Sequence, residues 1–163
     1  MSPNFVHLYL IYILFWALPA AVHAGEISIL RENGKLVIKA GEDLFTQYIY
    51  KDEQRSKPVL YPVIGPQQKA MTRKFPLEEK AEGEESDHPH HASLWYTHGD
   101  VNGVDFWAVG ENKGKIFHDE FLEMKEDSFT ASNFWKDGEG KTICQDKRKL
   151  SFFSFSKDER AID

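Results

Sequence analysis

Short apolar and aromatic runs separated by turn residues are the feature that most constrains the fold of this chain. After residue 24, no window of helical length shows a 3.6-residue apolar stripe bounded by capping residues. The clearest pair of runs is EISIL (26–30) and KLVIK (35–39), in which apolar and polar residues alternate as in a half-buried strand. Asn33-Gly34 between them is the strongest short-range hairpin signal. We therefore predict a β fold that begins with a hairpin.

The rest of the chain continues this pattern. KPVLYPVIGP (57–66) is extended, but Pro58 and Pro62 each remove a backbone donor and indicate an edge strand or a bulge. GDVNG and DGEG are turn sequences, and residues 78–87 form an acidic loop. Further strands are predicted in DLFTQYIY (43–50), SLWYTH (93–98), VDFWAV (104–109), KIFHDEFLEM (115–124), SFTASNFWK (128–136), KTICQDK (141–147) and KLSFFSFS (149–156). Many short strands of this kind predict an all-β, antiparallel β-sandwich.

The N-terminal segment predicts export. Residues 1–24 contain no Lys, Arg, Asp or Glu, and an apolar run precedes Pro19 and the small-residue stretch AAVHA. This pattern indicates a signal peptide over residues 1–24, cleaved after Ala24, and a single domain over residues 25–163 in the periplasm or outside the cell. An uncleaved segment would instead tether the protein to a membrane.

Charge and cysteine content limit the partners. The formal net charge of −6 argues against a nucleic-acid partner. A lone Cys144 cannot form an internal disulfide, and we expect it in the core.

The block DHPHHASLWYTHGDVNGVDFW, Asp87 to Trp107, holds four of the chain's 7 histidines. On an extended backbone, side chains two residues apart share a face. His88 and His90 are then expected to project together, with Pro89 fixing the backbone between them and His91 pointing away.

A metal site is one hypothesis for this block, because an H-x-H pair presents two imidazoles. His98 or His118 is available as a further ligand, and the bound metal would be zinc, copper or iron. The expected metal ligands are His88, His90, His91 and Asp87.

Proton transfer is the second hypothesis, since a histidine near its ordinary pKa exchanges protons at neutral pH. The aromatic residues could stack on the apolar face of a sugar, and Arg73 could bind a carboxylate. The catalytic candidates are His90, His98 and His118 with Asp105 or Glu120. The candidates for substrate binding are Arg73, Trp95, Tyr96, Asn102 and Trp107.

A rigid loop without chemistry is the third reading of the block. Asp87, Asp100 and Asn102 can accept hydrogen bonds from nearby amides in turns. Of the adjacent Phe106 and Trp107, one must face inward on a strand.

Three stretches together resemble a known family: KPVLYPVIGP with MTRKFP after it, the DHPHH…GDVNGVDFW block, and GKIFH. They are similar to the methane oxygenase PmoA family of exported bacterial proteins, over most of residues 26–163. The resemblance implies a metal-dependent oxygenase with copper or iron. It also implies a galactose-mutarotase-like sandwich among sugar-catabolism proteins, and a chain that is incomplete at its C-terminus because family members continue further.

The sequence therefore predicts an exported, carbohydrate-related enzyme or binder with a histidine-rich site, acting by acid–base or metal-assisted chemistry. A sugar lyase, isomerase or hydrolase would fit this description, with a carbohydrate or another small molecule as substrate. The alternatives are a metal-dependent oxygenase and a non-catalytic carbohydrate-binding module.

Overall fold

The structure is a computed structural model, and it describes residues 25–163. The predicted signal peptide, residues 1–24, lies outside the described residues. Within the described part, no helix is both long and apolar enough to cross a membrane.

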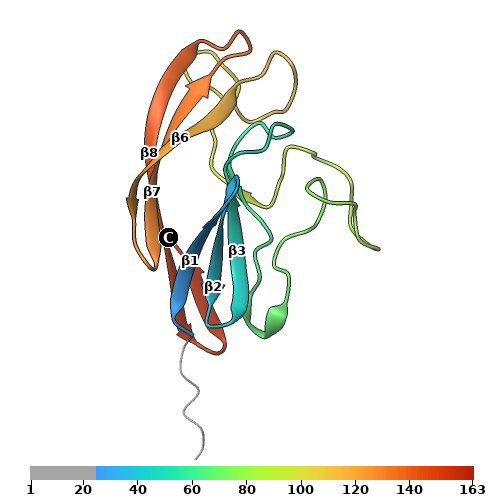
Figure 1. Cartoon of the computed structure of the whole chain (residues 1–163). Helices are drawn as coiled ribbons and strands as arrows, with labels where there is room; N and C mark the ends of the chain where they lie inside the picture. Colours follow the sequence, from blue (N-terminus) through green and yellow to red (C-terminus); the bar gives the residue numbers. More distant parts are fainter. Residues whose placement is uncertain (1–24) are drawn as a thin grey trace, which may run out of the picture.

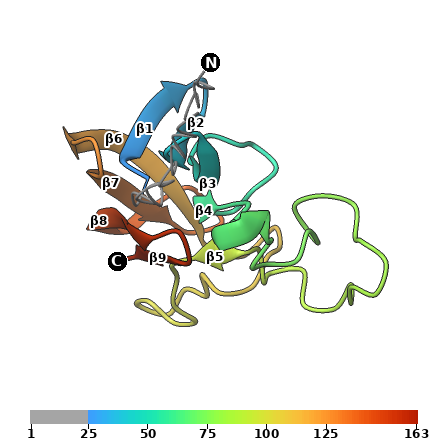
Figure 2. The same cartoon turned by 90° about the horizontal axis from the view of Figure 1, so that it is seen from below.

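Two antiparallel sheets pack face to face, so the predicted all-β sandwich is confirmed (Figure 1). The first sheet has the strand order β1-β2-β3-β4-β5 and the second has the order β6-β7-β8-β9. A short 3-10 turn, η1 (Pro66–Gln68), begins the long connection from β4 to β5, which projects from the edge of the sandwich (Figure 2). The strands are β1 (Ile27–Glu32), β2 (Lys35–Ala40), β3 (Asp43–Ile49), β4 (Val59–Leu60), β5 (Leu94–Trp95), β6 (Lys115–Met124), β7 (Ser128–Lys136), β8 (Thr142–Ser156) and β9 (Glu159–Ile162).

The hairpins follow the turn chemistry of the sequence. Glu32 pairs with Lys35 across the turn, and Gly34 has a φ of 76°, a conformation that glycine adopts without strain. The strands β6 and β7 begin and end where the sequence predicts. KTICQDK and KLSFFSFS, predicted as two strands, form the single strand β8.

The prediction of a strand over VDFWAV (104–109) is wrong, since only an isolated bridge joins Val101 to Val104. The carboxylate of Asp105 accepts hydrogen bonds from the backbone N–H groups of Trp107 (2.8 Å) and Ala108 (3.2 Å). In a strand, these N–H groups would donate to a neighbouring strand. The side chain of Asp105 therefore competes with strand pairing for the same donors. SLWYTH likewise contributes only the two-residue β5, and Ser93 before it has a φ of 58°.

The main core lies between the two sheets. Tyr48 on β3 packs on Phe129 of β7 with ring centroids 4.8 Å apart, and Phe45 meets Phe152 of β8 edge-on at 6.0 Å. All four side chains are at most 3% exposed, so their burial supplies much of the apolar stabilisation.

A smaller second cluster lies under the loop that connects β5 to β6. Phe106, Ile116 and Trp135 are buried together, and Cys144 packs against them half-buried. Trp135 also donates its indole N–H to Asp146 Oδ2 at 2.6 Å. This cluster fixes Phe106, whose neighbour Trp107 is part of the site described below.

We expect Gly114→Ala to destabilise the protein, because a Cβ at Gly114 would lie 2.4 Å from the ring of Phe106. Phe106 is fully buried and has no room to move, so the overpacking should lower the free energy of unfolding by about 1–3 kcal/mol in urea denaturation. Gly99→Ala is the control, since its nearest neighbour is 4.0 Å away. Equal stability of the two variants would contradict this account of the second core.

Candidate functional site

Residues 87–91, DHPHH, form a tight turn rather than an extended segment, and we refer to them as the histidine turn. The N–H of His91 donates to the carbonyl of His88 at 2.9 Å, and His88 has a φ of 45°. The expected alternation of the histidines is therefore wrong. The ring of His91 stacks on the ring of His88 at 5.1 Å with an interplanar angle of 12°, and the ring of His90 lies 4.4 Å from that of His91. All three imidazoles gather in one place.

Arg73 holds the histidine turn from its own loop. Its guanidinium donates to Asp87 Oδ1 (2.8 Å) and to the carbonyls of Asp87 (2.7 Å) and His88 (3.1 Å). His88 Nδ1 lies 2.6 Å from the second oxygen of Asp87. The hydrogen bonds from Arg73 and His88 lower the pKa of Asp87 below its usual range. Arg73, predicted to bind substrate, thus has its donors directed at the protein's own turn.

Two tryptophans continue the surface of the histidine turn. Trp107 lies 6.0 Å from the ring of His90 and 5.8 Å from that of His91, and Trp95 meets Trp107 edge-on at 5.0 Å. Trp107 is 43% exposed. The predicted residues His88, His90, His91, Asp87, Arg73, Trp95 and Trp107 are therefore brought together.

Lys57 is the residue of this candidate site that the sequence analysis missed. Its side chain is buried, and its ammonium donates to the carbonyls of Phe106 (2.6 Å) and Trp107 (3.1 Å). The same ammonium lies 4.3 Å from the centre of the Trp95 ring, a cation–π contact. Burial lowers the pKa of Lys57 to about 8, with Asp105 acting against this shift. A lysine next to Pro58 in an apolar run is the one local sign of its burial.

His90 and Lys57 line the same small cavity, which has a volume of about 230 Å³. Burial lowers the pKa of His90 below 6.5, the neighbouring His91, His88 and Lys57 lower it further, and Asp105 acts against this shift. At pH 7 the cavity therefore meets a neutral imidazole and a mostly protonated ammonium. The rest of its wall is formed by the polar residues Gln54, Arg55 and Ser56 and by the apolar residues Val59, Pro76, Leu77, Pro89, Ala92 and Val109.

The remaining residues of the sequence block have their main contacts outside the histidine turn, although Asp105 is near enough to raise the pKa of His90. Asp105 pairs with Lys113 at 2.9 Å, and this contact together with the backbone N–H bonds keeps its pKa low. His98 is exposed and contacts the backbone of Asp100, while Asn102 has a φ of 53° in the following turn.

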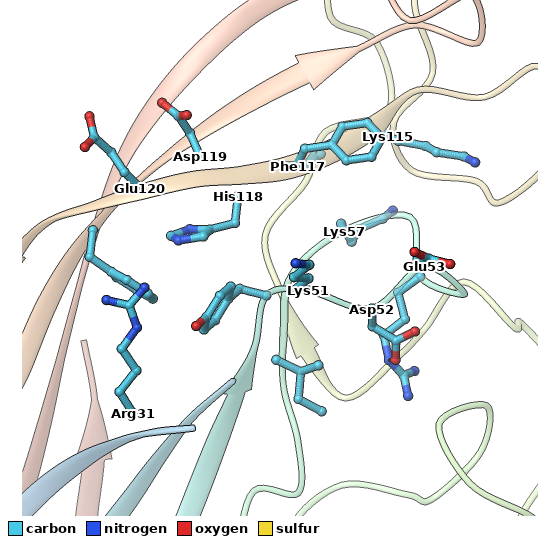
Figure 3. A pocket seen from close by; sticks show the side chains of 15 residues that line it. Arg31, Lys51, Asp52, Glu53, Lys57, Lys115, Phe117, His118, Asp119 and Glu120 are labelled. Atoms are coloured by element: carbon cyan, nitrogen blue, oxygen red, sulfur yellow. The ribbon is translucent and has the colours of Figure 1, made fainter. Parts of the chain in front are cut away.

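Two further predicted residues lie on other surfaces. Tyr96 packs on Trp135 at 6.2 Å, with the guanidinium of Arg148 4.6 Å from its ring. His118 lies on β6 in a separate cleft, between Tyr50 (4.5 Å) and Phe121 (4.3 Å) (Figure 3). Burial lowers the pKa of His118 to about 4. The candidate catalytic histidines thus lie in three different places: His90 in the histidine turn, His98 in an exposed turn and His118 in the cleft.

The imidazoles of the histidine turn lie close together but are not arranged as a set of metal ligands. In residues 25–163, no group of three or more His, Cys, Asp or Glu side chains is arranged to hold a metal ion. Binding of zinc, copper or iron by Asp87, His88, His90 and His91 stays a prediction.

The fold and the site define an all-β sandwich protein with an imidazole- and tryptophan-rich site at the edge of one sheet. The sequence matches DUF6807, a family of unknown function, over residues 35–163, and the chain belongs to this family. The expected membership of the methane oxygenase PmoA family is therefore wrong, because the match is to DUF6807. No curated protein and no solved structure matches the chain.

The stability of the protein should depend on the protonation of Lys57. Its pKa is about 8 in the folded state and 10.5 in the reference state, so the unfolded chain binds more protons between these values. The free energy of unfolding, taken relative to Lys57→Met, should therefore rise from pH 8 to 10.5 by up to about 3 kcal/mol. Urea denaturation of the wild type and of Lys57→Met across this pH range measures the difference in their free energies of unfolding. The contributions of the other titrating groups are common to both proteins and drop out of this difference. A difference that does not vary with pH would show that the ammonium is not buried.

Proposed function

We propose that this protein binds a carbohydrate at the histidine turn and transfers a proton to or from it through His90. The observation that carries the proposal is that His90 and Lys57 line one cavity beside the tryptophan pair Trp95 and Trp107. The apolar 24-residue N-terminal segment supports export as part of the same proposal.

The tryptophans supply the means of binding. The exposed face of Trp107 offers an apolar, rigid surface on which the C–H groups of a sugar ring can stack. The position of Trp107 is fixed because its carbonyl accepts from Lys57 and its ring rests on Trp95. A preorganised aromatic surface loses little conformational entropy when a ligand binds.

His90 supplies the proton acceptor. A neutral imidazole can take a proton from a sugar hydroxyl, or from a carbon next to a carbonyl, and return it later. The ammonium of Lys57 is held by two carbonyls in the same cavity wall, so its charge favours the negative charge that develops on the substrate oxygen. Two groups with different protonation states at one pH are the arrangement that acid–base catalysis requires. Isomerase, lyase and hydrolase chemistry all use such a step.

Proton transfer is tested by hydrogen exchange into sugars in D₂O, followed by NMR over a panel of neutral and acidic saccharides. We expect His90→Gln to reduce the exchange rate about 100- to 10,000-fold, because it removes the base. His98→Gln, which changes the same residue type outside the turn, should leave the rate unchanged. The wild-type rate should fall as the pH falls through the lowered pKa of His90, below 6.5, because the imidazole becomes protonated.

Sugar affinity separates an enzyme from a binding module. Trp107→Ala should weaken saccharide binding about tenfold or more in calorimetric titration, because stacking carries the binding energy. His90→Gln should change this affinity little. Tight saccharide binding without hydrogen exchange in any member of the panel would reject the catalytic part of the proposal and leave a carbohydrate-binding module.

Metal removal tests the mechanism. We expect the hydrogen-exchange rate to survive dialysis against EDTA, because His90 acts as a proton acceptor and not as a metal ligand. Elemental analysis of the wild type and of the His88→Ala/His90→Ala double variant accompanies this experiment. Near-stoichiometric zinc, copper or iron that is lost in the variant, together with loss of activity in EDTA, would replace the proton-transfer role by a metal-assisted one.

A further inference from the structure

A second cavity lies between the two sheets. Its volume is about 640 Å³, and it is formed by β6, the end of β3 and the loop that follows β3 (Figure 3). The residues that matter for its chemistry are Arg31, Tyr50, Lys51, His118 and Phe121. We call it the His118 cleft.

The His118 cleft is lined by side chains of both charges, with five basic and four acidic residues. Arg31 and Lys51 make no ion pair within residues 25–163. Figure 3 shows the ring of His118 on the same side of β6 as Arg31, and the carboxylates of Asp119 and Glu120 on the opposite side. His118 is neutral at pH 7, because burial lowers its pKa to about 4. The attraction for an anion therefore comes from Arg31 and Lys51.

The other charged residues of the cleft largely cancel. Asp52 is paired with Arg55 at 2.7 Å, and the exposed Glu53 and Lys115 have opposite formal charges. Lys57 adds a further cation to the wall. The lining of this cavity has one more basic than acidic residue, which contrasts with a chain whose net charge is −6. Such a local reversal of sign raises the local concentration of anionic ligands.

Aromatic rings line the cleft next to these cations. Tyr50 lies 4.5 Å from the ring of His118 and 5.0 Å from that of Phe121, and the guanidinium of Arg31 is 5.3 Å from the Phe121 ring. An apolar aromatic wall beside a guanidinium fits a ligand with both a C–H face and an acidic group. A sugar ring that carries a carboxylate or a sulfate has this combination.

The two cavities share a wall. Arg55 and Lys57 line both the His118 cleft and the 230 Å³ cavity at the histidine turn. The two cavities are therefore neighbours, separated by Arg55 and Lys57, which is the arrangement that a ligand of more than one sugar unit would require. The cavity at the histidine turn is too small for more than about one sugar ring, whereas the His118 cleft falls within the 300–1,000 Å³ range of ordinary ligand pockets.

We infer that the His118 cleft binds an anionic sugar unit of an oligosaccharide whose neighbouring unit reaches the histidine turn. This inference rests on the proposed function and names its substrate class as acidic oligosaccharides. Arg31 and Lys51 bind the acidic group, the guanidinium through paired N–H donors. Tyr50 and Phe121 contact the ring.

The test is calorimetric titration with three probes of equal length: an oligogalacturonate, a sulfated oligosaccharide and a neutral oligosaccharide. The wild type should bind at least one anionic probe at least tenfold more tightly than the neutral probe, and added salt should reduce this preference. The anionic probe that binds more tightly identifies the preferred acidic group as a carboxylate or a sulfate. The Arg31→Gln/Lys51→Gln variant should lose the preference and keep its affinity for the neutral probe.

The matched control is Lys141→Gln/Lys147→Gln, which removes the same charge from two exposed positions outside both cavities. Thermal unfolding of each variant confirms that it is folded. Equal affinity for anionic and neutral probes, or equal effects of the two double variants, would overturn the inference. Hydrogen exchange into neutral sugars would then still support the proposed function. An anionic preference that depends on Arg31 and Lys51 without any exchange would instead reject proton transfer and retain the cleft.

Discussion

The site depends on one buried ammonium. Lys57 lies next to the start of β4, and its hydrogen bonds reach the carbonyls of Phe106 and Trp107, 49 and 50 residues further along the chain. Burying a charge without a carboxylate partner is unfavourable, and the lowered pKa of about 8 reflects this cost. Two carbonyl oxygens and the face of Trp95 offset it. The lysine thereby joins the β5–β6 loop to the first sheet.

The other side chains of the proposed site depend on this contact between Lys57 and the β5–β6 loop. Because Trp107 is held in place, the imidazoles of His90 and His91 have a fixed aromatic neighbour. Because Lys57 stands in the wall between two cavities, the same charge influences the protonation of His90 and the polarity of the His118 cleft. The side chain of Lys57 therefore both fixes the position of Trp107 and influences the pKa of His90.

Much of the fold could be predicted from the sequence, because hairpins are local. The Asn33-Gly34 turn and the bounds of β6 and β7 depend on residues close in sequence. The strand predicted at VDFWAV does not form because the carboxylate of Asp105 accepts hydrogen bonds from the backbone N–H groups of Trp107 and Ala108. The alternation of apolar and polar residues gives no information about such hydrogen bonds. The sequence identifies residues 87–91 as a cluster of histidines. The geometry of the turn depends on the positive φ of His88, which the sequence pattern does not predict. The burial of Lys57 and the separation of His118 arise from tertiary packing, for which the sequence offers only the position of Lys57 beside Pro58.

Side-chain NMR titration of the histidines, with ¹⁵N-labelled imidazoles, tests the central claim most directly. The claim is that burial and the neighbouring basic residues lower the pKa of His90. His90 should titrate below 6.5, and its pKa should rise in Lys57→Met because a nearby positive charge is removed. A His90 resonance that titrates at or above 6.5, unchanged in Lys57→Met, would contradict the account of the site.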